Sequence, residues 1–287
     1  MLVDYHVHTA FSDDSDYAME DVVKDAIRKN IEELCFTDHV DYGVKPDWGQ
    51  PYTRFWHDKP VLNVNYPEFE KEYLRVKSLY NDQITLKMGY EFGVQMHTLD
   101  AFNALFNRYP LDFVILSIHQ VEDQEFWTQD FQKNRTQEEY NERYYEELYN
   151  VVCAFKNYSV VGHLDLIRRY DEAGVYPFEK LKPMIRKILT QVIQDGKGIE
   201  VNTSSFRYGL DDLMPSTAIL ELYRDCGGTL ITLGSDSHKE EHLGAYITLV
   251  KKKLKALGFK QYCTFDQMKP ILSKTKKPLR LFINHDR

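Results

Sequence analysis

The sequence predicts an α/β protein built on a parallel sheet, and a closed barrel is the simplest form of such a sheet. Short apolar runs typical of buried strands alternate with helical patterns about seven times along the 287 residues. No repeat, low-complexity tract or linker interrupts this alternation, so we expect one domain over residues 1–287. Apolar residues make up 43% of the chain, which is enough for a sizeable core.

The expected strands are short, and most of them end in a histidine or an acidic residue. The first begins almost at the N-terminus and alternates in the manner of a buried strand. The apolar runs predict strands at residues 2–8, 31–37, 84–91, 113–119, 159–163, 199–202 and 229–233.

The segments between these strands have helical patterns. Pro67 is expected in the first turn of a helix that extends to about residue 80, where proline is tolerated. Thr136 with Glu139 fits a capping box at the start of a long helix. The patterns predict helices at residues 16–30, 67–80, 98–108, 136–155, 177–194 and 217–224, then a last helical region and a closing apolar segment at 278–283.

Composition excludes several classes of protein. No run of about 18 uncharged apolar residues is present, so no membrane span is expected, and no signal peptide is recognised. The four cysteines are far apart and form no C-x-x-C pair, which favours reduced thiols in a cytoplasmic protein. A net charge of -8 argues against a nucleic-acid partner, while the carboxylates are suited to divalent cations.

The candidate chemistry lies at the strand ends. His6 and His8 are spaced i, i+2 on the first strand, so their imidazoles share one face and can reach one point. In a parallel barrel the active site lies at the C-terminal ends of the strands. Six of the ten histidines fall at such ends, which predicts a metal site there. The candidate ligands that end predicted strands are His6, His8, His39, Glu91, His119, His163, Asp236 and His238.

These strand ends resemble the ordered motifs of the PHP (polymerase and histidinol phosphatase) superfamily, from residue 1 to about 245. The motifs are Asp4-Tyr5-His6-Val7-His8, Thr37-Asp38-His39, Gly89-Tyr90-Glu91, Ser117-Ile118-His119, Gly162-His163 and Gly234-Ser235-Asp236-Ser237-His238. Two further segments resemble the histidinol-phosphate phosphatase branch of that superfamily. They are residues 162–170, GHLDLIRRY, and residues 200–207, EVNTSSFR.

The resemblance implies a distorted (β/α)7 TIM-like barrel with a site for two or three divalent metal ions. It implies that the first ion is bound by His6, His8, Glu91 and Asp236. Glu91 is then a bridging ligand to a second ion, which His119 and His163 also bind. The third ion is bound by Asp14, His39 and His238. Some members have histidine where this chain has Asp14, so softer metals are held less tightly here, and Asp13 is the alternative ligand. Sites of this composition accept Zn, Mn and Fe alike.

The implied activity is hydrolysis of L-histidinol phosphate in histidine biosynthesis, through attack of a metal-activated hydroxide on phosphorus. A PHP phosphoesterase acting on a nucleotide, a sugar phosphate or phosphotyrosine is the alternative, and a metal-binding scaffold without catalysis is a third hypothesis. Arg207 and Arg169 match the phosphate-binding positions, with Arg168 as the alternative to Arg169. Asp165 and His238 are candidate proton donors to the leaving group, and Glu122 is a candidate partner for the substrate's amine or imidazole.

Other features carry weaker expectations. The irregular stretch 42–66 is rich in aromatic residues, which form a lid over the site or are used for packing. The remaining histidines match no motif, and surface or core positions without a catalytic role are expected for His57, His97, His242 and His285.

Overall fold

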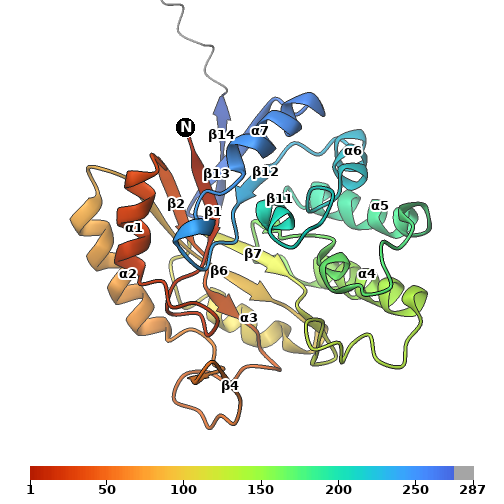
Figure 1. Ribbon diagram of the computed structural model, residues 1–287, viewed down its shortest axis with the longest axis horizontal. Coiled ribbons are helices and arrows are strands. Elements are labelled where there is room, and N and C mark those ends of the chain that lie inside the picture. The colour runs from red at the N-terminus through yellow and green to blue at the C-terminus, as the bar shows by residue number, and fades with distance from the viewer. Residues whose placement is uncertain (275–287) are drawn as a thin grey trace, which may run out of the picture.

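Seven parallel strands form a nearly closed barrel at the centre of the molecule, in the order β1-β2-β6-β7-β10-β11-β12 (Figure 1). The computed structural model describes residues 1–274. The barrel closes at β1 and β12, where the N–H of His8 donates to the carbonyl of Ser237 over 2.8 Å. The expected parallel barrel is therefore confirmed. Its strands are β1 (Val3–Val7), β2 (Glu33–Phe36), β6 (Thr85–Gly93), β7 (Phe113–Ser117), β10 (Val160–Val161), β11 (Gly198–Asn202) and β12 (Ile231–Gly234), with β3 (His39–Val40) paired to β6.

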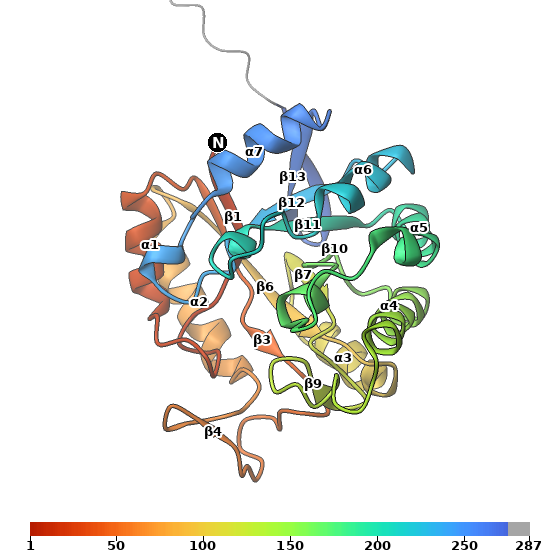
Figure 2. The same cartoon turned by 45° about the vertical axis from the view of Figure 1, so that its right-hand side comes forward.

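Helices surround the barrel, with α1 and α2 on one side and α4, α5 and α6 on the other (Figures 1 and 2). The capping box of α4 is confirmed, because Thr136 and Glu139 exchange side-chain to backbone hydrogen bonds. Over residues 1–274, no helix is both long enough and apolar enough to cross a membrane. The helices are α1 (Met19–Arg28), α2 (Tyr66–Tyr80), α3 (Leu99–Phe106), α4 (Gln137–Ala154), α5 (Phe178–Gln194), α6 (Thr217–Asp225) and α7 (Ile247–Ala256), with 3-10 turns η1 (Met96–Thr98), η2 (Leu166–Tyr170), η3 (Thr203–Phe206) and η4 (Glu240–His242).

The strands are buried on both faces, since side chains fill the barrel and helices cover its outer face. The end of the barrel opposite the candidate ligands is closed by the antiparallel hairpin β13 (Gln261–Asp266) and β14 (Lys269–Lys274). The Phe113 ring lies 5.0 Å from that of Tyr5 and 5.1 Å from that of Phe265, so the hairpin is part of the core. This hairpin was not expected from the sequence. The predicted segment 278–283 and His285 lie outside the described residues.

Two small hairpins lie beside the opposite end of the barrel. The first, β4 (Phe55–Trp56) with β5 (Lys59–Pro60), belongs to the irregular stretch 42–66 and projects at the bottom of Figure 1. The second is β8 (Gln120–Val121) with β9 (Gln124–Glu125) and follows β7 directly. Both hairpins supply side chains to the cavity described below.

Candidate metal centre

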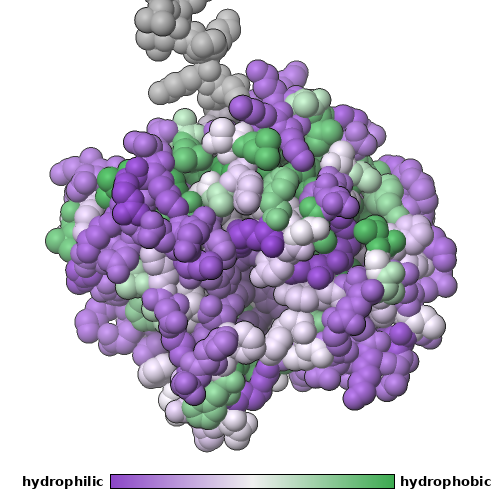
Figure 3. Space-filling view, viewed as in Figure 1, coloured by the Kyte–Doolittle hydropathy of each residue, from purple (hydrophilic) through white to green (hydrophobic). Residues whose placement is uncertain are grey.

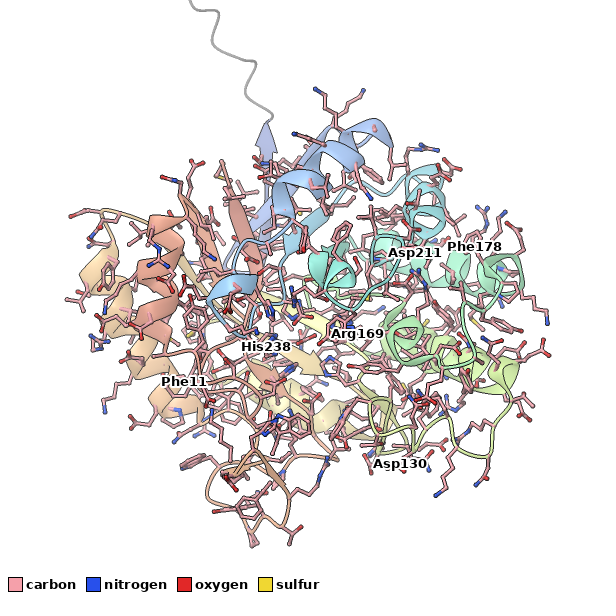
Figure 4. All side chains as sticks on the ribbon, viewed as in Figure 1. Phe11, Asp130, Arg169, Phe178, Asp211 and His238 are labelled. Atoms are coloured by element: carbon pink, nitrogen blue, oxygen red, sulfur yellow. The ribbon has the colours of Figure 1, made fainter. Side chains whose placement is uncertain are left out.

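A cavity of about 360 Å³ opens at the C-terminal ends of the barrel strands. The space-filling view shows a recess with a hydrophilic surface near the centre of this face (Figure 3). Arg169 and His238 both line the cavity and lie toward the centre of the molecule, whereas Asp130, Phe178 and Asp211 lie toward its periphery (Figure 4). Because parallel strands end at the same edge, residues from distant parts of the sequence meet here.

The first cluster contains the four residues expected to hold one ion. The Nε2 atom of His6 lies 3.1 Å from Oε2 of Glu91 and 3.7 Å from Oδ1 of Asp236. The Nε2 atom of His8 lies 3.5 Å from each of the same two oxygens. All four side chains are buried. The structure therefore brings the four predicted ligands of the first ion to one point.

Glu91 also belongs to the second cluster, through its other oxygen. Its Oε1 atom lies 2.7 Å from Nε2 of His163 and 3.1 Å from Nε2 of His119. The hydroxyl of Ser117 donates to the same oxygen over 2.7 Å. The two oxygens of one buried carboxylate thus face two groups of imidazoles, as a bridging ligand requires.

The third cluster lies nearer the surface. Oδ2 of Asp14 is 3.1 Å from Nε2 of His238 and 3.4 Å from Nε2 of His39. The ring of His8 stacks on both, with centroids 4.1 Å from His238 and 4.2 Å from His39, so this cluster adjoins the first. Asp13 points elsewhere, because its carboxylate accepts a hydrogen bond from Nζ of Lys45 over 2.7 Å. Of the two acidic residues, the structure places Asp14 with the imidazoles.

Backbone conformation contributes to this arrangement. Asp236 and His163 have positive φ angles of 56° and 21°, which are costly for residues other than glycine and are typical of functional sites. Gly93 lies against the side chains of Asp41 and His119, so that a Cβ atom there would clash with the Asp41 carboxylate. Gly234, the last residue of β12, is equally constrained, because a Cβ atom at this position would contact His6.

Carboxylates that the sequence analysis missed orient two of the imidazoles. Oε1 of Glu200 lies 2.6 Å from Nδ1 of His6, and Oδ1 of Asp41 lies 2.7 Å from Nδ1 of His119. Such partners fix the ring so that its other nitrogen faces the metal. The sequence contains an indication of each orienting carboxylate. Asp41 follows His39 at i+2, and Glu200 belongs to the segment 200–207, which resembles the histidinol-phosphate phosphatase branch.

The buried charges are coupled through the clusters. Burial alone would lower the pKa of His6, but the carboxylates of Glu200 and Glu91 raise that pKa well above its usual value. Burial alone would raise the pKa of Glu91, but the imidazoles of His6 and His119 hold it well below its usual value. Burial and the neighbouring imidazoles lower the pKa of His8, which favours the neutral form that binds metals.

The donor set fits divalent metal ions. Nε2 of His8 and Nδ1 of His39 are buried and make no hydrogen bond within the part of the chain that the structure describes, and Nδ1 of His39 faces Oε2 of Glu91 at 3.1 Å. Within residues 1–274, atoms able to bind a metal lie within 4.8 Å of one another in four groups, which are His6–His8–Asp236, His6–Glu91–His163, His8–His39–His238 and His39–Asp41–His119. A cation would satisfy the unpartnered nitrogens and offset the buried carboxylates, as His/Asp/Glu sites for Zn, Mn or Fe do. The structure thus contains clusters that could bind metal ions.

Of the three arginines expected near phosphate, two reach the cavity. Arg169 lines it and donates from Nη2 to Ser204 Oγ over 2.6 Å, with Asp236 Oδ2 at 3.3 Å. Arg207 lines it as well and donates to the carbonyls of Ser235 and Asp236. The alternative, Arg168, does not line the cavity.

Arg168 forms an ion pair with Asp165, and the contacts of this pair correct one expectation. Asp165 is fully buried and accepts hydrogen bonds from Arg168 Nη1 over 2.7 Å and from the N–H of Ser216 over 2.9 Å. Neither Asp165 nor Arg168 lines the cavity. The structure therefore places Asp165 outside the cavity, in an ion pair with Arg168, and does not support it as the proton donor to the leaving group. His238, the other candidate, does line the cavity.

Two more expectations require correction. The Glu122 side chain is 61% exposed and pairs with Arg143, 3.1 Å away, on the surface outside the cavity. The structure therefore places the Glu122 carboxylate outside the cavity, paired with Arg143. His242 was expected to have no role at the site, yet it lines the cavity, and burial and Arg207 lower its pKa to about 4.

The irregular stretch 42–66 contributes Lys45 and Trp56 to the cavity. Lys45 is held between Asp13 and Asp41, with Nζ 3.0 Å from Oδ2 of Asp41. Trp56 contacts Trp127 across the mouth, with ring centroids 5.4 Å apart. This stretch therefore forms one wall of the cavity.

The strands of this parallel barrel end in buried clusters of imidazoles and carboxylates. This combination of fold and site is that of a barrel-type metalloenzyme. The chain belongs to the PHP domain family, whose sequence model matches residues 4–204.

Similar proteins support this assignment over nearly the whole chain. Histidinol-phosphatase of Lactococcus lactis is 30% identical over 284 residues, with 97% of this chain and 98% of that protein covered. A probable histidinol-phosphatase of Thermotoga maritima is 27% identical, with 96% and 100% covered. The crystal structure of histidinol phosphate phosphatase from L. lactis, complexed with Zn, L-histidinol and phosphate, superposes with a TM-score of 0.80 at 31% identity and covers 94% of this chain and 98% of that one.

Proposed function

We propose that this protein is a metal-dependent phosphomonoesterase that hydrolyses L-histidinol phosphate to histidinol and phosphate in histidine biosynthesis. The observation that carries the proposal is the meeting, in one cavity, of buried imidazole and carboxylate clusters with the guanidinium groups of Arg169 and Arg207. The similarity to the L. lactis enzyme, whose structure contains Zn, L-histidinol and phosphate, supports this substrate.

We propose that two or three divalent ions, of Zn, Mn or Fe, occupy the clusters. The first would be held by His6, His8, Glu91 and Asp236, the second by Glu91, His119 and His163, and the third by Asp14, His39 and His238. When bound, such ions supply a nucleophilic hydroxide at neutral pH and polarise the phosphoryl oxygens.

The protein's own groups position the phosphate. Arginine offers planar, forked donors that match phosphate oxygens, and Arg169 and Arg207 both face the cavity beside Asp236. Tyr208 lies under the Arg169 guanidinium, 4.0 Å from ring centroid to Cζ, and limits the directions in which that fork can point. The two arginines thus fix the phosphoryl group against the first cluster.

His238 is the proposed proton donor to the leaving alkoxide. It lines the cavity, and although burial lowers its pKa, the carboxylates of Asp14 and Asp236 raise that pKa above its usual value. A protonated imidazole at this position can give up its Nε2 proton, which otherwise faces Asp14. If His238 instead binds the third ion, it cannot donate, so the two roles are alternatives.

We further propose that residues 1–287 act as one catalytic domain with a small-molecule substrate in the cytoplasm. The match to relatives along 96–97% of the chain supports a single domain. All four cysteines are free thiols, as is usual for cytoplasmic proteins.

The test is phosphate release by the purified protein with Mn or Zn. Turnover of L-histidinol phosphate should exceed that of p-nitrophenyl phosphate and of nucleotide, sugar and tyrosine phosphates at equal concentration. Elemental analysis of protein purified without added metal identifies the native ion. Turnover of histidinol phosphate no better than that of the other esters would refute the substrate while leaving the phosphatase chemistry in place.

A further inference from the structure

Lys45 is a cation at the cavity that the proposed reaction does not use. Within residues 1–274, the lysine and arginine side chains that line the cavity are those of Lys45, Arg169 and Arg207. The two arginines are the proposed phosphate ligands, whereas the ammonium of Lys45 contacts the carboxylates of Asp13 and Asp41. Because these carboxylates offset its charge, Lys45 is a weak candidate for binding phosphate directly.

A single turn of backbone places this ammonium beside Asp41. The N–H of Lys45 donates to the carbonyl of Asp41 over 2.9 Å, so the two side chains, four residues apart, lie on the same side of the turn. Asn63 holds the turn, because its Oδ1 accepts from the N–H of Asp41 over 2.8 Å and its Nδ2 donates to the carbonyl of Lys45 over 2.9 Å. The Lys45 side chain is therefore fixed in place, and it is only 11% exposed.

Through Asp41, Lys45 contacts the support of the second cluster. The two oxygens of this carboxylate have separate partners, since Oδ2 lies 3.0 Å from Nζ of Lys45 and Oδ1 lies 2.7 Å from Nδ1 of His119. Asp41 is buried, and a buried charge that loses its cation is strongly destabilised where it stands. The ammonium thus stabilises the carboxylate in the position from which it orients the His119 ring.

Through Asp13, Lys45 also contacts the loop that carries a residue of the third cluster. Its Nζ lies 2.7 Å from Oδ1 of Asp13, whose side chain is buried as well. The next residue is Asp14, whose Oδ2 lies 3.1 Å from Nε2 of His238. A fixed Asp13 limits how far the carboxylate of its neighbour can move. One ammonium therefore joins the supports of two clusters.

We propose that Lys45 is a positioning residue for the second and third clusters, so that their affinity for divalent ions depends on its ammonium group. It acts through the carboxylates on either side of it. The first cluster lies outside this network, because the carboxylate that orients His6 belongs to Glu200. This inference rests on the proposed metal-dependent function.

The experiment titrates the chelator-treated protein with Mn in competition with a chromogenic chelator, so that affinities are measured without turnover. Lys45→Met keeps a long side chain but removes its charge, and it should weaken two classes of site about 10- to 100-fold, the usual cost of losing a partner of a metal ligand. The class that belongs to the first cluster should keep its wild-type affinity. At saturating Mn, kcat should return close to the wild-type value, because the ligands themselves are unchanged.

Lys59→Met is the matched control. Lys59 also joins the stretch 42–66 to the loop after β1, since its Nζ lies 2.5 Å from Oδ1 of Asp16, but this pair is at the surface, with the two side chains 34% and 89% exposed. Its replacement should leave every metal affinity unchanged. If Lys59→Met weakens the sites as Lys45→Met does, Lys45 acts only by attaching the stretch to the loop, and the inference is refuted.

Two further variants assign the classes of site and do not depend on the folding of Lys45→Met. Asp41→Asn should weaken the second class alone, and Asp13→Asn should weaken the third class alone. Adding Lys45→Met to Asp41→Asn should cause no further loss at the second class, since the contact that transmits the effect is already broken. Additive losses at that class, or an Asp13→Asn variant with an unchanged third class, would refute the positioning role.

Other results would also overturn the inference. Unchanged metal affinities in Lys45→Met, whether or not Tm falls, would leave the residue a purely structural role. A raised inhibition constant of inorganic phosphate at saturating Mn, with unchanged metal affinities, would place Lys45 on the phosphate instead. A wild type that binds no divalent ion would refute the proposed function itself, which distinguishes that failure from failure of the inference.

Discussion

Replacement of Glu91 by Gln tests whether one carboxylate serves two metal ions. Oε2 lies within 3.5 Å of the imidazole nitrogens of His6 and His8, and Oε1 lies within 3.1 Å of those of His119 and His163. Glutamine is nearly the same shape but carries no charge and only one acceptor oxygen. Whichever way the amide is oriented, one cluster receives an N–H₂ group in place of a ligand and both lose the charge.

The size of the effect follows from these distances. Two unit charges about 4 Å apart attract each other by about 4 kcal/mol at an effective dielectric constant of ~20. Carboxylate oxygens bind zinc at ~2.0–2.2 Å, which is closer still. The affinity of each of the two clusters should therefore fall by at least a factor of about 10² to 10³. At limiting metal, kcat/KM should fall by a similar factor because the nucleophile is then lost.

The assay is metal titration of the chelator-treated protein, with stoichiometry by elemental analysis and phosphate release in parallel. The control is Asp236→Asn, an identical carboxylate-to-amide change at a residue that contacts the first cluster but not His119 or His163. Asp236→Asn should leave the His119–His163 cluster unaffected, and Glu91→Gln should weaken that cluster as well as the first. If Glu91→Gln weakens no more classes of site than Asp236→Asn does, the bridging role is refuted.

Further predictions concern residues around the clusters. Asp41→Asn should weaken metal binding at the His119 cluster by about 10- to 100-fold, measured by calorimetry, because the ring loses its orienting partner; unchanged affinity would contradict that role. Arg169→Met should raise the inhibition constant of inorganic phosphate about 10-fold or more. Arg168→Met should leave the phosphate constant unchanged and cost about 3–5 kcal/mol in unfolding experiments, because the buried Asp165 loses its cation; a changed phosphate constant would instead place Arg168 at the site. Chelation of the metals should lower Tm by on the order of 5–10 °C relative to protein at a hundredfold excess over Kd, and re-addition should restore it.

Sequence patterns were informative where the geometry of one strand or the polarity of the sheet decides the outcome. His6 and His8 share a face because strand side chains alternate, and the parallel sheet brings strand ends together whatever their separation in the chain. These rules anticipated the convergence of Glu91 and Asp236 with the histidines. They say nothing about loops, where neighbouring residues point in directions that only the fold determines.

The arginine pair illustrates that limit. Arg168 and Arg169 lie in the 3-10 turn η2, in which successive side chains point about 120° apart, so that only one of them can face the cavity. Which one does so depends on how the turn packs against the rest of the protein. Glu122 and Glu125 differ in the same way, since Glu122 lies in the tight turn of the β8–β9 hairpin, where it points outward, and Glu125 lies on β9.

The hairpin β13–β14 was missed because its turn lacks the usual sequence signal. Gln267 and Met268 occupy the turn with positive φ angles of 48° and 65°. Two-residue turns of this shape normally contain glycine, asparagine or aspartate. The hairpin forms despite this, because Cys263 and Phe265 are buried at the base of the barrel.

The seam between β1 and β12 connects the candidate metal centre with the folding of the chain. His6 and His8 come from the first strand of the barrel, and Asp236 and His238 follow its last strand. Ions that bind these residues would fasten the beginning of the chain to a segment more than 220 residues later. During synthesis His6 and His8 leave the ribosome long before Asp236 and His238, so the ligands of both ends are present together only when most of the polypeptide has been made. We therefore expect metal binding to be a late step in folding, and to stabilise the closed barrel at the seam between β1 and β12.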